Sequence, residues 1–86
     1  DTVAIGAMKA IEDKGLSIPD DISVIGIDGL VVTEYANPTL TTLVQPAEEM
    51  GRQSVEMLLS LLGGEKTPRH LLIKPALRSG ASVRKV

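Results

Sequence analysis

The hydrophobic positions of this chain predict helices that alternate with buried strands. Residues 3–14 carry apolar side chains at helical spacing, namely Ala4, Ala7, Met8 and Ile11. Residues 22–27 are almost continuously apolar, a pattern typical of a strand that is covered on both faces, as in a parallel sheet. A helix, a short loop and such a strand form half of a β-α-β unit, so the pattern indicates an α/β fold.

The residues around the first helix set its expected ends. Asp1 or Thr2 is predicted to cap its start by accepting a hydrogen bond from an early backbone N–H, and Gly15 is predicted to end it. Ile5 lies on the flank that it shares with Lys9 rather than on the apolar stripe. An apolar residue there is more often incidental, although it could contact a partner.

The second half of the chain predicts one strong helix between two short strands. The first strand spans residues 40–44, and the helix follows, with Pro46 at its first position and the glycines at 63–64 at its end. A third strand is expected at residues 71–74, and a last extended piece begins at Pro75. The stretch 30–37 stays open between a helical turn and a loop.

Composition narrows the classes of function. The chain has 86 residues, of which 43% are hydrophobic and 23% charged, as in a globular domain. It lacks cysteine and has a single histidine, which excludes disulfides, thiolate metal sites and multi-histidine metal sites. Its apolar runs are all shorter than the ~20 residues that a membrane-spanning helix needs. Because the chain begins at Asp1 without a signal-like stretch, we expect a segment of a longer protein.

The charge distribution is uneven. A formal net charge of −2 argues against a dedicated nucleic-acid surface, although six of the nine basic residues lie between Lys66 and Lys85. This basic tail could contact phosphate or an acidic partner, but a solvated end of the chain is the favoured interpretation.

Motifs for catalysis are missing from the sequence. It contains no phosphate-binding loop, no dinucleotide fingerprint and no nucleophile elbow, and Asp20, Asp21 and Asp28 do not have the spacing of a calcium loop. His70 has no triad-like partners. We therefore expect no catalytic residue, no metal and no cofactor. An enzyme fragment whose catalytic partners lie outside this chain stays an alternative.

Asp28 is the strongest candidate for a binding residue. It follows a buried strand, and in open α/β sheets ligands bind outside the carboxyl ends of the strands. A carboxylate there accepts several hydrogen bonds, which suits the vicinal hydroxyls of a sugar or the ring N–H groups of a base. The alternative is a tight Asp28-Gly29 turn in which the carboxylate bonds its own backbone.

The order of these residues resembles the LacI/GalR family of bacterial transcription regulators, in the last third of their chains. The resemblance extends to Ser82 and rests on positions 4–10, 18–28, 38–42, 45–46, 50–51, 58–59 and 75–77, together with Asp1, Gly15 and Gly63. It implies a partial periplasmic-binding-protein-like sandwich, a mostly parallel sheet flanked by helices. It also implies two lobes, with residues 1–44 and 75–86 in the C-terminal lobe and residues 45–74 in the N-terminal lobe.

The resemblance also assigns residues to sites. Asp28 carries over as the ligand contact and Gln45, more weakly, as a hinge residue at the cleft. Ile5, Lys9 and Tyr35 become candidates for a homodimer interface. Two positions depart from the family pattern: Gly29 stands where an Asn or Asp is usual, and Gly80 stands where an Arg is usual, so the tail is expected to be looser or paired differently.

The function implied by the resemblance is the effector-sensing and dimerising part of a cytoplasmic, sugar-responsive transcriptional repressor. Its operator DNA would be contacted only through an N-terminal domain outside this chain, and its effector, a small molecule such as a sugar, would bias closure of the lobes. The alternatives are a periplasmic sugar-binding protein of a transport system and a pure dimerisation module.

Overall fold

The chain divides into two compact units. A computed structural model describes residues 1–66 and 70–86. The first unit contains Asp1–Gln45 and Ala76–Val86, and the second contains Pro46–Pro75. These bounds lie within one residue of the lobe bounds expected from the sequence. The assignment of the two units to the two lobes of a regulator core stays a prediction.

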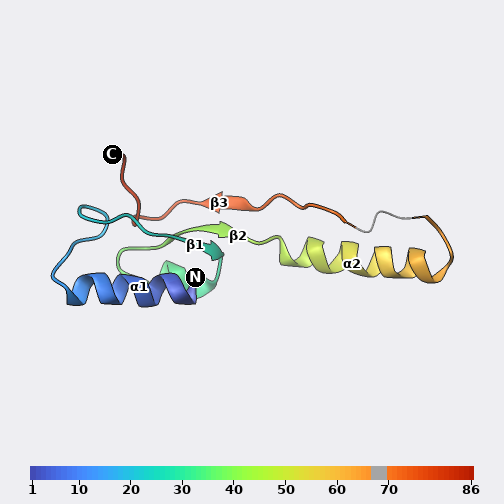
Figure 1. Ribbon diagram of the computed structural model, residues 1–86, viewed down its shortest axis with the longest axis horizontal. Helices are drawn as coiled ribbons and strands as arrows, with labels where there is room; N and C mark the ends of the chain where they lie inside the picture. The colour runs from blue at the N-terminus through green and yellow to red at the C-terminus, as the bar shows by residue number, and fades with distance from the viewer. Residues whose placement is uncertain (67–69) are drawn as a thin grey trace. The chain divides into compact units, whose positions relative to one another are not determined.

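A three-stranded sheet organises the first unit. Helix α1 (Thr2–Asp13) precedes β1 (Ile25–Asp28), which is followed by β2 (Thr41–Val44) and, after the second unit, by β3 (Ala76–Arg78). The strand order is β1-β2-β3, with β2 parallel to β1 and antiparallel to β3, so the sheet is partly parallel (Figure 1). Helix α1 packs against β1.

The predicted end of α1 is confirmed, whereas the predicted cap at its start is wrong. Gly15 has a φ of +78°, and its N–H donates to the carbonyl of Glu12 while that of Leu16 donates to the carbonyl of Ile11. This pair of bonds is the Schellman ending that a glycine favours. Asp1 occupies the N-cap position but makes no side-chain cap hydrogen bond. Its carboxylate contacts distant residues instead, as described below.

The buried centre of the first unit is small and unusually polar. Its fully buried side chains are Leu40, Thr33, Thr42 and Ser82. Met8 of α1 is almost as deeply buried, with 3% of its surface exposed. The Ser82 hydroxyl accepts a hydrogen bond from the Thr41 N–H (2.8 Å) and donates to the Val24 carbonyl (2.6 Å). Hydrogen bonds therefore join the end of the chain to the sheet where a larger domain would use apolar packing.

The tail at Gly80 was expected to be looser or paired differently, and the structure contradicts only the first of these alternatives. The Gly80 N–H donates to Thr41 Oγ1 (2.9 Å), and the Ala81 N–H donates to the Thr39 carbonyl (2.8 Å). A Cβ added at position 80 would lie only 2.5 Å from that carbonyl oxygen. The glycine therefore permits a close approach of the two backbones that a larger residue would prevent.

The first predicted strand is shorter and more exposed than its sequence indicates. It begins at Ile25 rather than at residue 22, and Ile25 and Ile27 are 57% and 49% exposed. The prediction that both faces of this strand are covered is therefore wrong for the described residues. The physical reason is that α1 is the one helix with extensive contacts to β1 among the described residues, so it covers the strand only in part. The open stretch 30–37 contains the 3-10 turn η1 (Val31–Glu34).

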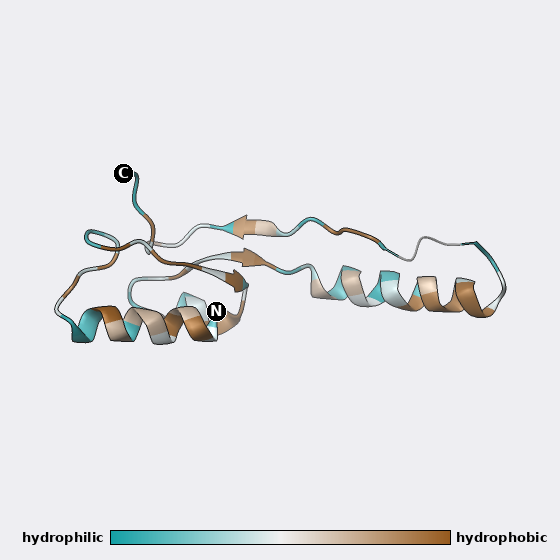
Figure 2. Cartoon of the chain, in the orientation of Figure 1, coloured by the Kyte–Doolittle hydropathy of each residue, from teal (hydrophilic) through white to brown (hydrophobic). Residues whose placement is uncertain are grey.

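The second unit consists of one long helix and an extended segment. Helix α2 (Ala47–Leu62) begins after Pro46, which is its N-cap residue, and Gly64 has a φ of +78° at its end. The strand predicted at residues 71–74 is wrong, since this segment has no strand partner among the described residues. Apolar residues gather toward the C-terminal half of α2 (Figure 2). Together with residues 71–73 they line a groove of about 540 Å³.

An ion-pair cluster covers the polar side of α2. Arg52 bonds Glu49 and lies 2.6 Å from a carboxylate oxygen of Glu56. The hydrogen bond from Arg52 lowers the pKa of Glu49 below its ordinary value, with a further contribution from Gln53. The same bond raises the pKa of Arg52. These groups are exposed, so the cluster stabilises the helix locally rather than forming a site.

Candidate functional site

Asp28 ends β1 with a backbone conformation that side-chain-bearing residues rarely adopt. Its φ is +122°, and it is the non-glycine residue with a positive φ among the described residues. Such conformations cost about 1–3 kcal/mol and persist only where the surrounding structure holds them in place. They also concentrate at functional sites, so the strain is a physical reason, independent of the resemblance, to consider Asp28 a site residue.

Hydrogen bonds to residues of β2 and the residue after it hold the backbone of Asp28 in this conformation. The Asp28 carbonyl accepts from the Gln45 N–H (3.1 Å), and the next N–H, of Gly29, donates to Thr42 Oγ1 (3.3 Å). Gly29 has a φ of +79°, and a Cβ there would lie 2.8 Å from the Cα of Val44. A glycine at position 29 therefore lets the chain pass close to β2.

The Asp28 carboxylate itself is exposed. Within the described part of the chain no hydrogen bond from its own backbone to this carboxylate is found, so the alternative of a self-bonded turn has no support in the structure. The side chain stands at the carboxyl end of a strand that pairs in parallel with β2, where Asp28 is opposite Val44. A carboxylate in this position can accept hydrogen bonds from hydroxyl or N–H groups of a ligand.

Gln45 lies directly beside Asp28. It follows β2 immediately, and its backbone N–H is the donor to the Asp28 carbonyl. The structure thus brings together the two residues that the sequence analysis assigned to ligand binding, because Asp28 ends β1 and Gln45 follows β2, its parallel neighbour. Their ligand-binding role stays a prediction.

Asp1 supports this edge of the sheet, a role that sequence analysis missed. Its carboxylate accepts hydrogen bonds from Thr42 Oγ1 (2.6 Å) and from the Leu30 N–H (2.7 Å), and its backbone nitrogen donates to the Ile27 carbonyl (2.9 Å). Asp1 is buried despite its charge. Nothing local in the sequence signals these bonds, since the partners lie 26–41 positions away.

The three interface candidates differ in exposure. Tyr35, just after η1, is 82% exposed, and Ile5 is half-buried. The Lys9 ammonium is engaged within α1, 2.8 Å from a carboxylate oxygen of Asp13, in an exposed pair. None of these observations tests an interface, so the three residues stay predictions.

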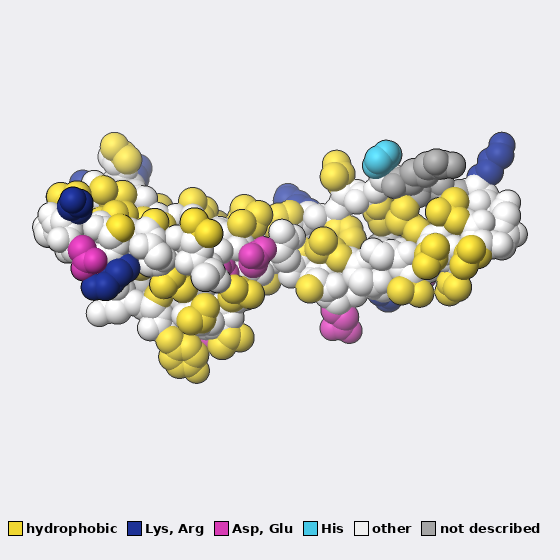
Figure 3. Space-filling view, turned by 60° about the horizontal axis from the view of Figure 1, so that its bottom comes forward, with side chains coloured by type: hydrophobic (Ala, Val, Ile, Leu, Met, Phe, Trp, Pro, Cys, Tyr) yellow, Lys and Arg dark blue, Asp and Glu magenta, His cyan; other side chains and the backbone are white. Residues whose placement is uncertain are grey.

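The turn beside Tyr35 carries further exposed apolar residues. Three consecutive apolar side chains are exposed there, namely those of Leu30, Val31 and Val32. Hydrophobic side chains reach the surface at many places in the space-filling view (Figure 3). The sequence shows this run of three apolar residues. Its exposure could not be predicted, because the secondary structure of residues 30–37 was left open.

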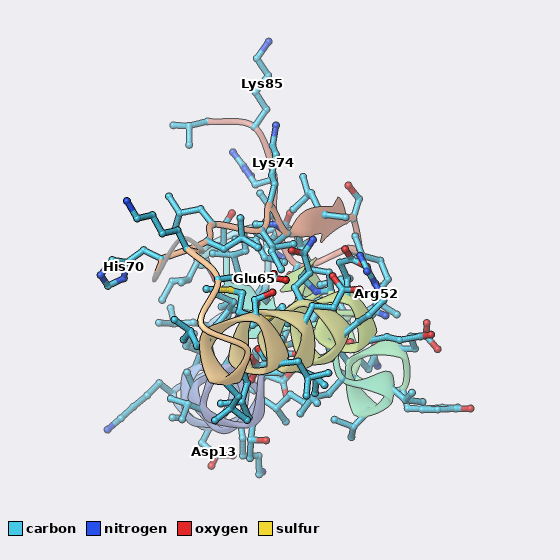
Figure 4. The ribbon with its side chains drawn as sticks, turned by 90° about the vertical axis from the view of Figure 1, so that its right-hand side faces the viewer. Asp13, Arg52, Glu65, His70, Lys74 and Lys85 are labelled. Atoms are coloured by element: carbon cyan, nitrogen blue, oxygen red, sulfur yellow. The ribbon has the colours of Figure 1, made fainter. Side chains whose placement is uncertain are left out.

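His70 and two lysines of the basic tail are exposed to solvent. His70, Lys74 and Lys85 are exposed, and their side chains extend outward (Figure 4). No group of acidic or histidine side chains that could hold a metal ion occurs among the residues that the structure describes. In the same residues, no helix is long and apolar enough to cross a membrane.

Comparison with known proteins identifies the domain. Residues 1–83 match the model of the periplasmic binding protein-like domain. The chain belongs to the periplasmic binding protein-like domain family. The α/β fold expected from the sequence is therefore confirmed for this domain.

Relatives of this periplasmic binding protein-like domain are transcription regulators. The chain is 42% identical over 77 residues, or 90% of its length, to the HTH-type transcriptional regulator MalR of Clostridium butyricum, of which it covers 23%. The crystal structure of the lac repressor dimer bound to operator and the anti-inducer ONPF has 35% identity and a TM-score of 0.90, with 96% of this chain and 29% of that chain covered.

The structure of a third relative contains a bound sugar. The LacI family transcriptional regulator from Arthrobacter sp. FB24 in complex with lactose has 35% identity and a TM-score of 0.81, covering 98% of this chain and 33% of that chain. The predicted resemblance to LacI/GalR regulators is confirmed. The chain spans less than a quarter of the length of the curated relatives it matches.

Proposed function

We propose that this chain is the effector-sensing and dimerising part of a sugar-responsive transcriptional repressor that acts in the cytoplasm. The observation that carries the proposal is the match of 96% of the chain to a lac repressor bound to its operator. The relatives named above are regulators, which favours a repressor over a transport-type sugar-binding protein and over an enzyme. Operator contacts would come from a DNA-binding domain outside these 86 residues.

In this proposal Asp28 and Gln45 face the effector. The exposed carboxylate of Asp28 would accept hydrogen bonds from sugar hydroxyls, and these charge-assisted bonds are about twice as strong as neutral ones. Support comes from the strained φ of Asp28 and from the lactose complex of the Arthrobacter regulator. Binding would bias the two lobes toward one arrangement and thereby change operator affinity.

The full-length protein tests this function directly. We expect it to bind the promoter region of its own operon with a dissociation constant in the nanomolar range, as specific repressors do. One member of a panel of mono- and disaccharides that includes lactose should change this affinity by at least about tenfold, the size of a typical allosteric coupling. Electrophoretic mobility shift with each sugar measures both. Sugar binding without any DNA binding would instead indicate a transport-type receptor.

Dimerisation through α1 and the turn near Tyr35 gives a second expected result. Ile5→Glu places a charge on a half-buried position of the proposed interface and should raise the dimer dissociation constant about tenfold, because burying an uncompensated charge is costly. Analytical ultracentrifugation of the full-length protein measures it. The matched control is Ala10→Glu, which places the same charge at an exposed position of α1 away from the flank that carries Ile5. An unchanged dissociation constant in the Ile5→Glu variant would remove Ile5 from the interface.

A further inference from the structure

Arg78 reaches across the first unit to the loop that follows Asp28. It lies on β3, yet its guanidinium donates to the Leu30 carbonyl (3.1 Å) and to Thr33 Oγ1. It also forms an ion pair with the Glu34 carboxylate at 3.5 Å. One arginine thus contacts three residues of a single loop, 44–48 positions earlier in the chain. Its side chain is 33% exposed, so water screens these contacts only partly.

The contacted loop is also held by hydrogen bonds that do not involve Arg78. The Thr33 hydroxyl is fully buried and donates to the Leu30 carbonyl (2.6 Å), while the Leu40 N–H donates to the Thr33 carbonyl (3.2 Å). Arg78 and Thr42 are register partners on β3 and β2. Thr42 holds the Gly29 N–H, and Arg78 holds the Leu30 carbonyl one residue later. Two neighbouring strands therefore each fix one peptide group of the loop, the one that joins Asp28 to Gly29 and the one that joins Leu30 to Val31.

We infer that Arg78 is a positioning residue for the effector response, in that it fixes the loop between Asp28 and Tyr35. This inference rests on the proposed function, because the loop joins the carboxylate assigned to the effector to the exposed apolar turn assigned to the dimer. Arg78 does not touch the ligand. It holds the two ends of the loop, at Asp28 and at η1, at a fixed distance from each other. A displacement of one end therefore moves the other end as well.

The chemistry of arginine is needed for this role. Its planar guanidinium presents several N–H donors in fixed directions and can serve a carbonyl, a hydroxyl and a carboxylate at once. A lysine would keep the positive charge but supply a single donor centre. A methionine would keep most of the stem and lose the charge and every donor.

Amide hydrogen exchange of the full-length protein tests the inference without any ligand. Compared with the natural protein, Arg78→Met should exchange at least about tenfold faster in a peptide covering residues 28–35, since bonds from a charged donor are lost. Arg78→Lys should recover part of the protection. Arg84→Met is the matched control, because Arg84 lies 3.9 Å from Asp20 in an exposed pair and should leave this peptide unchanged.

Titration with lactose is the second measurement. If the natural protein binds lactose, Arg78→Met should bind it about tenfold more weakly at a temperature at which circular dichroism shows both proteins to be folded. Equal affinity despite faster loop exchange would overturn the positioning role, and so would unchanged exchange or an equal rise across the whole first unit. If the natural protein binds no lactose, the exchange result alone decides on Arg78, and the failure concerns only the choice of sugar in the proposed function.

Discussion

Asp28→Asn is expected to weaken sugar binding by the full-length protein while leaving its fold intact. Asparagine has nearly the same shape as aspartate, so the hydrogen bonds of the Asp28 carbonyl and of the Gly29 N–H, which hold the backbone at a φ of +122°, are kept. The substitution removes the negative charge and replaces one acceptor oxygen by a donor group. A hydrogen bond to a charged group contributes about 1.5–3 kcal/mol, so the affinity for the responsive sugar should fall about 10- to 100-fold. Isothermal titration calorimetry measures this change.

Two further variants separate a binding role from a structural one. Asp28→Gly relieves the backbone strain and should lose sugar affinity at least as strongly, with no loss of unfolding free energy. Asp20→Asn, which removes another exposed carboxylate of the same unit, should keep the natural affinity. If Asp28→Asn binds sugar as tightly as the natural protein, the carboxylate has no part in recognition and the strained turn is only structural.

Local chemistry explains why the C-terminal ends of the helices and the place of Asp28 at the end of a strand could be predicted. A left-handed glycine ends each helix because the energetic advantage of glycine acts within the same turn, as at Gly15 and Gly64. The position of Asp28 after an apolar run likewise depends only on the strand that carries it. Asp28 lies beside Gln45 because two successive strands are parallel. The helix-loop-strand pattern and the resemblance had indicated this parallel arrangement.

The errors arose where the outcome depends on distant residues. Asp1 has the right chemistry for a helix cap, but its carboxylate accepts hydrogen bonds from the Thr42 hydroxyl and the Leu30 N–H instead. Residues 71–74 have the composition of a strand, yet a strand forms only where a partner offers backbone groups. The exposure of Ile25 and Ile27 has the same origin, since an apolar run indicates burial without stating what covers it. The contacts of Arg78 could not be predicted for a related reason. Its acceptors are mostly backbone and hydroxyl oxygens of distant residues, and no charge pattern in the sequence indicates them.

Thr42→Val should be the most destabilising conservative substitution in the first unit. Valine has the same shape as threonine, so packing around this fully buried residue is preserved. The lost hydroxyl, however, donates to the Asp1 carboxylate and accepts from the Gly29 N–H. Each buried polar group left without its partner costs about 1–3 kcal/mol, so we expect a loss of about 2–4 kcal/mol in unfolding free energy. Urea unfolding of the full-length protein, followed by circular dichroism, measures it.

The hydroxyl rather than the methyl group accounts for this loss, and a matched pair of variants distinguishes them. Thr42→Ser keeps the hydroxyl and removes one methyl group, which costs only about 0.8 kcal/mol. Thr2→Val makes the valine change at an exposed position and should leave the unfolding free energy nearly unchanged. Because Thr42 also holds the Gly29 N–H, Thr42→Val should weaken sugar binding as well, whereas Thr42→Ser should not. Equal losses of stability in the Val and Ser variants would contradict the argument, since they would show that packing and not the hydrogen bonds to Asp1 and Gly29 stabilises this edge of the sheet.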